Sequence, residues 1–211
     1  IVIIDYGSGN LRSAAKAFER AASEVSSKVR VNVTSDPRLL INASHIVLPG
    51  VGAFADCLSG LNALNGMLDA LEKSIKNDGK AFLGICVGMQ LMARVGKEYG
   101  EHEGLGWINS EVIPINPSNS QLKVPHMGWN DLKINMPHPC LSGILTGDHT
   151  YFVHGYHMRC NNEKEVMATV DYGEPVTAVV ARDNILGTQF HPEKSQSTGL
   201  LFIKNFINWQ P

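Results

Sequence analysis

The chain has 211 residues, with 18 basic and 20 acidic side chains and a net charge of −2. This length supports one sizeable core, and the scattered basic residues form no footprint for nucleic acid or an anionic membrane. No segment has the apolar length that spans a bilayer, and the 4 cysteines lack metal-ligand spacing. We therefore expect a single domain over residues 1–211 in the cytoplasm, with no metal, no cofactor and no nucleic-acid or membrane partner.

The first half of the chain alternates short apolar runs with stretches of helical composition. The apolar runs occupy residues 1–5, 29–34, 45–48 and 81–85, and the helix candidates occupy residues 11–22, 67–76 and 89–95. This alternation predicts an α/β fold with an open, mostly parallel, flavodoxin-like sheet that is flanked by helices.

The second half differs in character. Residues 110–190 contain several strand-like runs that Pro, Gly and Asn interrupt, which predicts added antiparallel strands. Residues 198–209 then predict a final amphipathic helix packed on the sheet.

Cys86 lies in a Gly-x-Cys-x-Gly segment, Gly84-Ile85-Cys86-Val87-Gly88, directly after a buried apolar run. This is the thiol counterpart of the Gly-x-Ser-x-Gly nucleophile elbow, in which glycines relieve crowding around a strained, exposed nucleophile. A helix N-terminus at Cys86 favours thiolate over thiol because its partial charge is positive. The segment predicts a cysteine nucleophile on a strand-to-helix turn.

His191 and Glu193 follow another strand-like run and flank Pro192, which cannot donate to a strand ladder. Residues two apart on an extended segment point to the same side, so Glu193 can orient the His191 imidazole while His191 transfers protons for Cys86. Taken singly, such a cysteine is more often a core side chain and such a His-Pro-Glu more often a surface turn. Their combination predicts a Cys-His-Glu triad.

The Gly50-Val51-Gly52-Ala53-Phe54-Ala55 segment formally fits the dinucleotide pattern Gly-x-Gly-x-x-Gly/Ala. The favoured interpretation is an oxyanion loop, because it follows a strand whose end must lie beside the triad. The backbone N–H groups of Val51 and Val87 would then stabilise the tetrahedral intermediate.

Six segments in a fixed order, at residues 4–11, 48–54, 84–90, 125–130, 151–154 and 191–195, carry a family resemblance. With them the chain resembles the class I (triad) glutamine amidotransferases. The Pro-Gly-Val-Gly, His-Met-Gly-Trp-Asn and Glu-Lys-Ser segments are most similar to the branch that provides the glutaminase component of imidazole glycerol phosphate synthases. The resemblance also implies that the oxyanion loop can change its peptide orientation and so switch hydrolysis on.

The resemblance implies L-glutamine as substrate, bound by Gly50, Gly52, Gln90 and Glu98 and by the backbone of residues 151–155. Glu98 would bind the α-ammonium group, while amide and backbone donors take the α-carboxylate. Gln90 and Glu98 could also be solvated helix residues. A Ser or Thr is more usual at Gly155, so a hydroxyl contact is missing. By spacing, His154 and His157 could be metal ligands, but structural roles are favoured.

The resemblance further implies a heterodimer with a cyclase subunit of (β/α)8-barrel fold, which would use the released ammonia in histidine biosynthesis. The family pattern assigns Asn10, Trp129, Tyr151 and Lys194 to the docking face, although Trp129 could equally be a core aromatic. Alternatives are the glutaminase component of another class I amidotransferase, an autonomous cysteine peptidase or γ-glutamyl hydrolase, and a non-catalytic scaffold.

Overall fold

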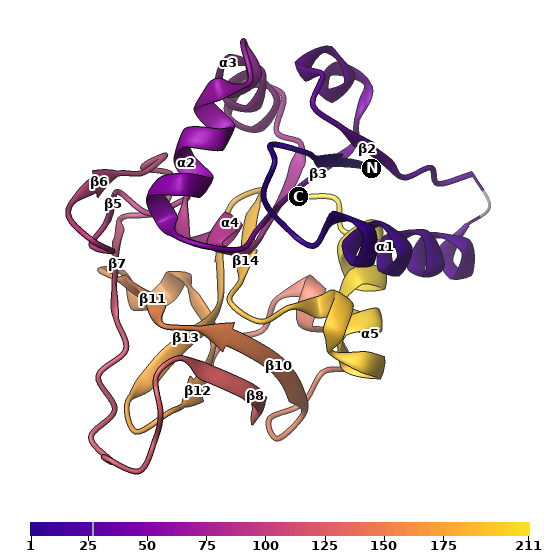
Figure 1. Cartoon of the computed structure of the whole chain (residues 1–211). Helices are drawn as coiled ribbons and strands as arrows, with labels where there is room; N and C mark the ends of the chain where they lie inside the picture. The colour runs from indigo at the N-terminus through magenta and orange to yellow at the C-terminus, as the bar shows by residue number, and fades with distance from the viewer. Residues whose placement is uncertain (27) are drawn as a thin grey trace.

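A computed structural model describes residues 1–26 and 28–211 (Figure 1). Its main sheet has eight strands in the order β2-β1-β3-β4-β14-β13-β12-β9. The first five run parallel: β2 (Asn32–Thr34), β1 (Val2–Ile4), β3 (His45–Gly50), β4 (Ala81–Cys86) and β14 (Ile185–Thr188). This repeats the 2-1-3-4-5 order of flavodoxin-like sheets, which confirms the predicted fold class.

Most antiparallel strands come from residues 110–190, as predicted; the exception is a short antiparallel pair at residues 95–96 and 102–103, which was not predicted. The main sheet continues with β13 (Pro175–Arg182), β12 (Val166–Asp171) and β9 (Lys133–Ile134). A two-stranded sheet joins β8 (His126–Asp131) to β10 (His149–His154). A third sheet contains β11 (Tyr156–Cys160), β7 (Ser110–Pro114), β5 (Val95–Gly96) and β6 (His102–Glu103).

Helices cover both sides of the parallel strands (Figure 1). Helices α1 (Leu11–Val25) and α5 (Gln196–Asn208) lie together on one side. There the Phe18 and Phe206 rings pack edge to face, with their centroids 6.3 Å apart. Helices α2 (Phe54–Ala63) and α3 (Met67–Glu72) lie on the other. The short helix α4 (Val87–Gln90) follows β4 directly. Among residues 1–26 and 28–211, no helix has both the length and the apolar character to cross a membrane.

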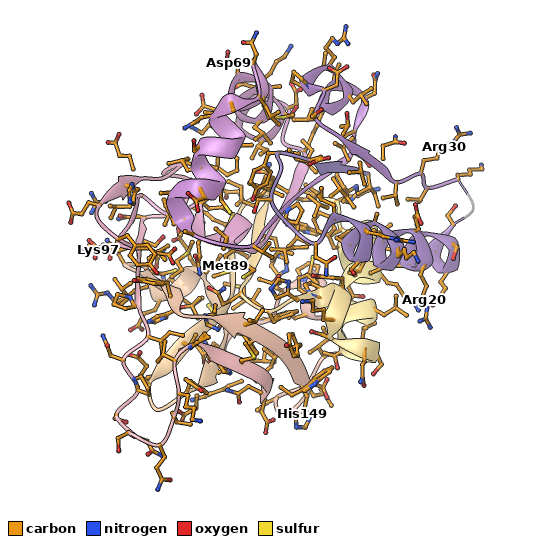
Figure 2. All side chains as sticks on the ribbon, viewed as in Figure 1. Arg20, Arg30, Asp69, Met89, Lys97 and His149 are labelled. Carbon is orange, nitrogen blue, oxygen red and sulfur yellow. The ribbon has the colours of Figure 1, made fainter. Side chains whose placement is uncertain are left out.

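The core fills the space between these layers. Figure 2 shows Met89 in the crowded interior, whereas Arg20, Arg30 and Asp69 extend from the periphery. Met89 is fully buried, and Phe18, Phe82 and Phe190 are among the largest side chains that exclude solvent completely. The apolar runs at residues 1–5, 45–48 and 81–85 therefore lie largely in the core. The run at 29–34 was also predicted as a buried strand, and this was wrong, because it contains the edge strand β2 and has no buried residue.

The predicted helix at 89–95 is wrong. Helix α4 ends at Gln90, because the segment at 104–108 takes the carbonyls that a longer helix would use: Leu105 N–H donates to Leu91, Ile108 to Met92 and Gly106 to Ala93. Leu91, Met92 and Ala93 are also fully buried, so this stretch has no solvent face. Helical composition was misleading here because tertiary hydrogen bonds override propensity.

Helix α2 was not predicted, because Ser59, Gly60 and Asn62 lower its helical propensity. It forms because Phe54, Cys57 and Leu61 recur at helical spacing and bury one face. Gly60 fits a tight contact there, since a Cβ at this position would lie 2.6 Å from the Tyr6 carbonyl oxygen.

The turn between β4 and α4 is the most constrained part of the backbone. Cys86 has φ 54°, a positive value that non-glycine residues rarely adopt. A Cβ on Gly88 would lie 1.8 Å from the Leu48 carbonyl oxygen of β3, and a Cβ on Gly84 would lie 2.6 Å from the Gly88 carbonyl oxygen. Only glycines allow α4 to approach β3 so closely, and this approach fixes the turn that carries Cys86.

A buried histidine pair joins β8 to β10. His154 Nδ1 lies 2.8 Å from the Tyr156 carbonyl oxygen, which can only accept, so this nitrogen carries the proton. His154 Nε2 then accepts from His126 Nδ1 at 3.1 Å, and His126 Nε2 accepts from the Asn130 amide at 3.2 Å. Burial lowers the pKa of His126 to about 4 and that of His154 to about 3, so both rings are neutral.

We predict that Gly88→Ala lowers the free energy of unfolding by about 3 kcal/mol or more, because the added methyl group meets backbone that no side-chain rotation can clear. Urea unfolding measures this. The matched control is Gly155→Ala, whose Cβ meets only Val124 Cγ1 at an ordinary 3.6 Å. Equal stability of the two variants would contradict the close approach at Gly88.

The histidine pair predicts a loss of stability in mild acid. Both rings bind protons more readily in the unfolded chain, so their contribution is complete above about pH 6.5 and is lost as pH falls toward about 4. Between pH 7.5 and 5, His154→Gln should remove about 1–2 kcal/mol of the pH-dependent loss. Urea unfolding at both pH values measures this, with the exposed His149→Gln on the same strand as control. An unchanged pH dependence in His154→Gln would refute the neutral pair.

Candidate active site

Two neighbouring parallel strands bring the predicted catalytic residues together. Strand β14 pairs with β4 in a register that sets Thr188 beside Ile85. The next residues of each strand, Gln189 and Cys86, therefore emerge side by side at the carboxyl edge of the sheet. His191 follows two residues later, and its N–H donates to the Tyr151 carbonyl of β10 at 2.9 Å.

His191 and Glu193 form a buried pair. His191 Nδ1 donates to Glu193 Oε1 at 2.8 Å, and both side chains are almost fully enclosed. His191 Nε2 is beside the Cys86 thiol but makes no aligned hydrogen bond with any described residue. Burial works to lower the pKa of His191, but the contacts with Cys86 and Glu193 outweigh it and raise the pKa. The site therefore favours a protonated imidazole beside the sulfur, a state suited to a thiolate-imidazolium pair.

Ser195 holds the histidine turn in place, a contribution that the sequence interpretation missed. Its hydroxyl donates to the His191 carbonyl oxygen at 2.7 Å and accepts from the Tyr151 N–H at 3.0 Å. The side chain is buried, so both contacts are shielded from water.

Cys86 opens into a cavity of about 170 Å³. Its lining includes both predicted oxyanion donors and three of the four residues predicted to bind glutamine, Gly52, Gln90 and Glu98. The full lining is Val51, Gly52, Cys86, Val87, Gln90, Glu98, Val153, His154, Gly155 and Tyr156. Gly50 is not among them, since it packs against α4, where a Cβ would lie 2.7 Å from the Gly88 nitrogen. A larger cavity of about 630 Å³ around His157 is lined by none of the residues of the predicted triad, oxyanion loop or glutamine site.

The predicted oxyanion donors differ in their present orientation. Val87 begins α4, where backbone N–H groups lack intrahelical acceptors. Val51 N–H instead donates to the Ser8 hydroxyl at 3.3 Å, and that hydroxyl donates back to the Val51 carbonyl oxygen at 2.5 Å. The Val51 N–H is therefore directed at Ser8 in this conformation. It would have to turn before it could point at an oxyanion formed beside Cys86.

Glu98 and Gln90 both line the cavity, and each has some of its polar atoms already bound within the protein. One carboxylate oxygen of Glu98 accepts from the Phe54 N–H at the start of α2 at 2.7 Å, which fixes the carboxylate beside the cavity. Gln90 is buried, and its amide nitrogen donates to both the Tyr156 carbonyl at 2.9 Å and Gln189 Oε1 at 3.1 Å. The amide hydrogens of Gln90 are therefore engaged internally, which leaves its oxygen for a ligand.

Gln189 is a further site residue to which the sequence interpretation gave no role. Its side chain is fully buried, and its amide nitrogen lies 3.6 Å from Cys86 Sγ. A signal was available in its position two residues before His191. The extended geometry predicted for His191 and Glu193 was wrong, because Pro192–Lys194 form a 3₁₀ helix, and Glu193 reaches His191 through this turn.

Three of the four predicted docking residues lie together. Trp129 on β8 is paired with Tyr151 on β10, their rings pack at 5.9 Å, and Lys194 Nζ lies 5.5 Å from the Tyr151 ring centroid. Trp129 is 46% exposed, so the core alternative for it is wrong. Asn10 precedes α1, the helix that contacts the 3₁₀ helix Pro192–Lys194.

Comparisons with known proteins agree with this geometry. The profile of the family Glutamine amidotransferase class-I matches residues 2–209. The chain is 54% identical over 214 residues to imidazole glycerol phosphate synthase subunit HisH of Bradyrhizobium diazoefficiens, covering 100% of this chain and 99% of that protein. It is 56% identical over 209 residues to the same subunit of Ruegeria pomeroyi, covering 99% and 98%.

Solved structures support the fold. A glutamine amidotransferase crystal structure matches with a TM-score of 0.72 at 20% identity, over 98% of both chains. A glutamine amidotransferase from Thermotoga maritima matches with a TM-score of 0.67 at 15% identity, over 98% of this chain and 81% of that one. With a profile match along nearly its whole length and relatives above 50% identity, the chain belongs to the class-I glutamine amidotransferase family, in the branch of the HisH glutaminase subunits of imidazole glycerol phosphate synthase.

Proposed function

We propose that this chain hydrolyses L-glutamine to glutamate and ammonia through a Cys86-His191-Glu193 triad. The observation that carries the proposal is the strained Cys86 turn at the mouth of a small cavity, beside a buried imidazole that a carboxylate holds at 2.8 Å. Cys86 Sγ attacks the amide carbon, and His191 gives the departing nitrogen its proton. Water then attacks the thioester while His191 accepts its proton, and the thiolate leaves.

The cavity suits the amino-acid end of glutamine. The free oxygen of Glu98 and the oxygen of Gln90 are acceptors, so both fit the α-ammonium group. Donors for the α-carboxylate would come from backbone N–H groups of Gly52 and of the cavity-lining part of the 151–155 segment, residues 153–155, since the Tyr151 N–H is taken by Ser195. Val87 N–H, and Val51 N–H after its peptide turns, would stabilise the tetrahedral oxyanion. Gly50 would support the oxyanion loop through its packing on α4.

A cyclase of (β/α)8-barrel fold is the proposed partner, in a cytoplasmic heterodimer in which residues 1–211 act as one glutaminase domain. Ammonia that reached water would be protonated and lost, so a protected route to the second active site is needed. Trp129, Tyr151 and Lys194 form a partly exposed cluster of the kind that anchors interfaces, and Asn10 would extend the docking face.

A glutamine-mimicking diazo-ketone tests the nucleophile. We expect it to label Cys86 in preference to the other thiols, because burial raises the pKa of Cys57 and Cys140 and raises that of Cys160 to about 12. Peptide mass spectrometry locates the label, and Cys86→Ala is the control that should lose both label and turnover. Labelling spread evenly over the four cysteines would refute the assignment.

The triad predicts an order of effects. Glu193→Gln should lower kcat less than His191→Ala does, by a factor of about ten or more, because the carboxylate orients the base but transfers no proton. Ammonia release at saturating glutamine measures both. If Glu193→Gln had wild-type turnover, another group would have to hold His191.

A serine at position 155 is predicted to raise the affinity for glutamine. A side chain fits here without strain, since a Cβ would meet only Val124 Cγ1 at 3.6 Å. Gly155→Ser adds a hydroxyl to the cavity wall and should lower KM for glutamine about threefold to tenfold, the value of one added hydrogen bond. Gly155→Ala is the matched control without the hydroxyl. Equal KM values for the two variants would mean that this wall does not touch substrate.

A further inference from the structure

A continuous chain of hydrogen bonds leads from the cavity wall to the nucleophile. The Tyr156 carbonyl oxygen accepts from Gln90 Nε2 at 2.9 Å, Gln90 Nε2 also donates to Gln189 Oε1 at 3.1 Å, and Gln189 Nε2 lies 3.6 Å from Cys86 Sγ. The last distance is a hydrogen-bond distance for sulfur, whose radius exceeds that of oxygen. The side chains of Gln90, Gln189 and Cys86 are all buried.

The donor and acceptor roles in this series of hydrogen bonds are fixed at the end farthest from Cys86. A carbonyl oxygen only accepts, so the end of Gln90 at Tyr156 must be the amide nitrogen. That nitrogen needs an acceptor in Gln189, which turns Gln189 Oε1 toward Gln90 and Gln189 Nε2 toward Cys86. The sulfur therefore faces an N–H donor and not an amide oxygen.

The main chain also holds Gln189 in place. Its backbone N–H donates to the Ala178 carbonyl of β13 at 2.9 Å, and it directly follows Thr188 in β14. Enclosing a carboxamide completely is costly unless its groups are paired, and an apolar side chain would fill this volume at lower cost. A buried donor aimed at a sulfur is thus a feature that packing alone does not require.

We propose that Gln189 is a positioning residue that holds Cys86 Sγ and stabilises its thiolate through the Nε2 hydrogen bond. The inference rests on the proposed role of Cys86 as nucleophile. The thiolate exists twice in the cycle, before attack on the amide and when it leaves the thioester, so this donor serves acylation and deacylation alike. Gln90 acts through Gln189 by fixing its orientation.

Several ionisable groups surround the sulfur and must be held constant in a test. His191 faces it with Glu193 behind, Cys57 and Tyr6 lie beneath the oxyanion loop, and Glu98 stands across the cavity. An uncharged substitution at Gln189 leaves all of these in place and adds no new charge. A change in thiolate formation in such a variant then reports on the Gln189 donor.

The test is the pH dependence of Cys86 alkylation by iodoacetamide, a neutral electrophile, in the full chain. Wild type is compared with Gln189→Met, which removes the hydrogen bonds at similar volume, and Gln189→Glu, which keeps an acceptor for Gln90 but turns an oxygen toward the sulfur. Cys86→Ala gives the background of the other cysteines. Asn205→Leu is the matched control, because Asn205 donates to the Cys140 and Ser142 carbonyls far from Cys86.

We expect both Gln189 variants to shift the midpoint of the alkylation profile upward by about one pH unit and to slow alkylation at pH 7 about tenfold. The shift should be larger for Gln189→Glu, and Asn205→Leu should retain the wild-type profile. Should Gln189→Met fail to fold, Gln189→Leu takes its place, because it also removes the donor and, unlike Gln189→Glu, adds no charge beside the sulfur.

Profiles of the Gln189 variants that superimpose on wild type, or an equal shift in Asn205→Leu, would overturn the inference while leaving the nucleophile assignment intact. A wild-type chain whose Cys86 is alkylated no faster than the buried cysteines would instead overturn the proposed function. The two failures are therefore distinguishable.

Discussion

The approach of Gly88 to the main chain of Leu48 is the constraint on which the rest of the site depends. With a Cβ position only 1.8 Å from a carbonyl oxygen, α4 can lie this close to β3 solely because residue 88 has no side chain. The chain must then turn sharply after β4, and Cys86 takes a positive φ of 54°. Strain of this kind costs roughly 1–3 kcal/mol and persists only where the surrounding structure over-determines it. Here it directs a thiol into the cavity.

A second level of order is polar and comes from the segment that follows β14. Gln189 and His191 precede a 3₁₀ helix at Pro192–Lys194 that brings Glu193 to the His191 ring, so a donor, a base and an orienting carboxylate meet at one edge of the sheet. The Tyr156 carbonyl oxygen joins this set to the opposite wall, because it accepts from both Gln90 and His154. Through His154 and His126 the hydrogen bonds extend to Asn130 on β8, the strand that carries Trp129. Contiguous hydrogen bonds thus connect the nucleophile to the strand that carries one of the proposed docking residues.

Much of this arrangement could be predicted from the sequence, where local pattern and chemistry agree. The apolar runs of β1, β3 and β4 and the glycines around Cys86 carry strong signals. The His-Pro-Glu segment follows the cysteine segment in the order along the chain that a cysteine-dependent α/β enzyme requires. Helix α2 was missed because its formation depends on burial of Phe54, Cys57 and Leu61 and not on propensity. The end of α4 was misjudged because the residues that take its carbonyls lie at 104–108, beyond the reach of local pattern.

The orientation of polar groups was the least predictable feature. Val51 N–H was expected at the oxyanion, and the structure directs it at Ser8, a contact between residues 43 positions apart. Gln90 was expected to donate to substrate, and its hydrogens are taken by Tyr156 and Gln189. Such choices depend on which acceptor lies nearest in the folded chain, and spacing along the sequence carries no record of it.

The most direct measurement is the rate of ammonia release from glutamine, determined for the isolated chain and for its complex with a barrel cyclase carrying its ribotide ligand. With Val51 N–H held by Ser8 in the free chain, hydrolysis should be slow alone, rise strongly in the loaded complex, and vanish in both with Cys86→Ala. Turnover by the isolated chain equal to that of the complex would contradict partner gating, and ammonia release by Cys86→Ala would contradict the triad itself.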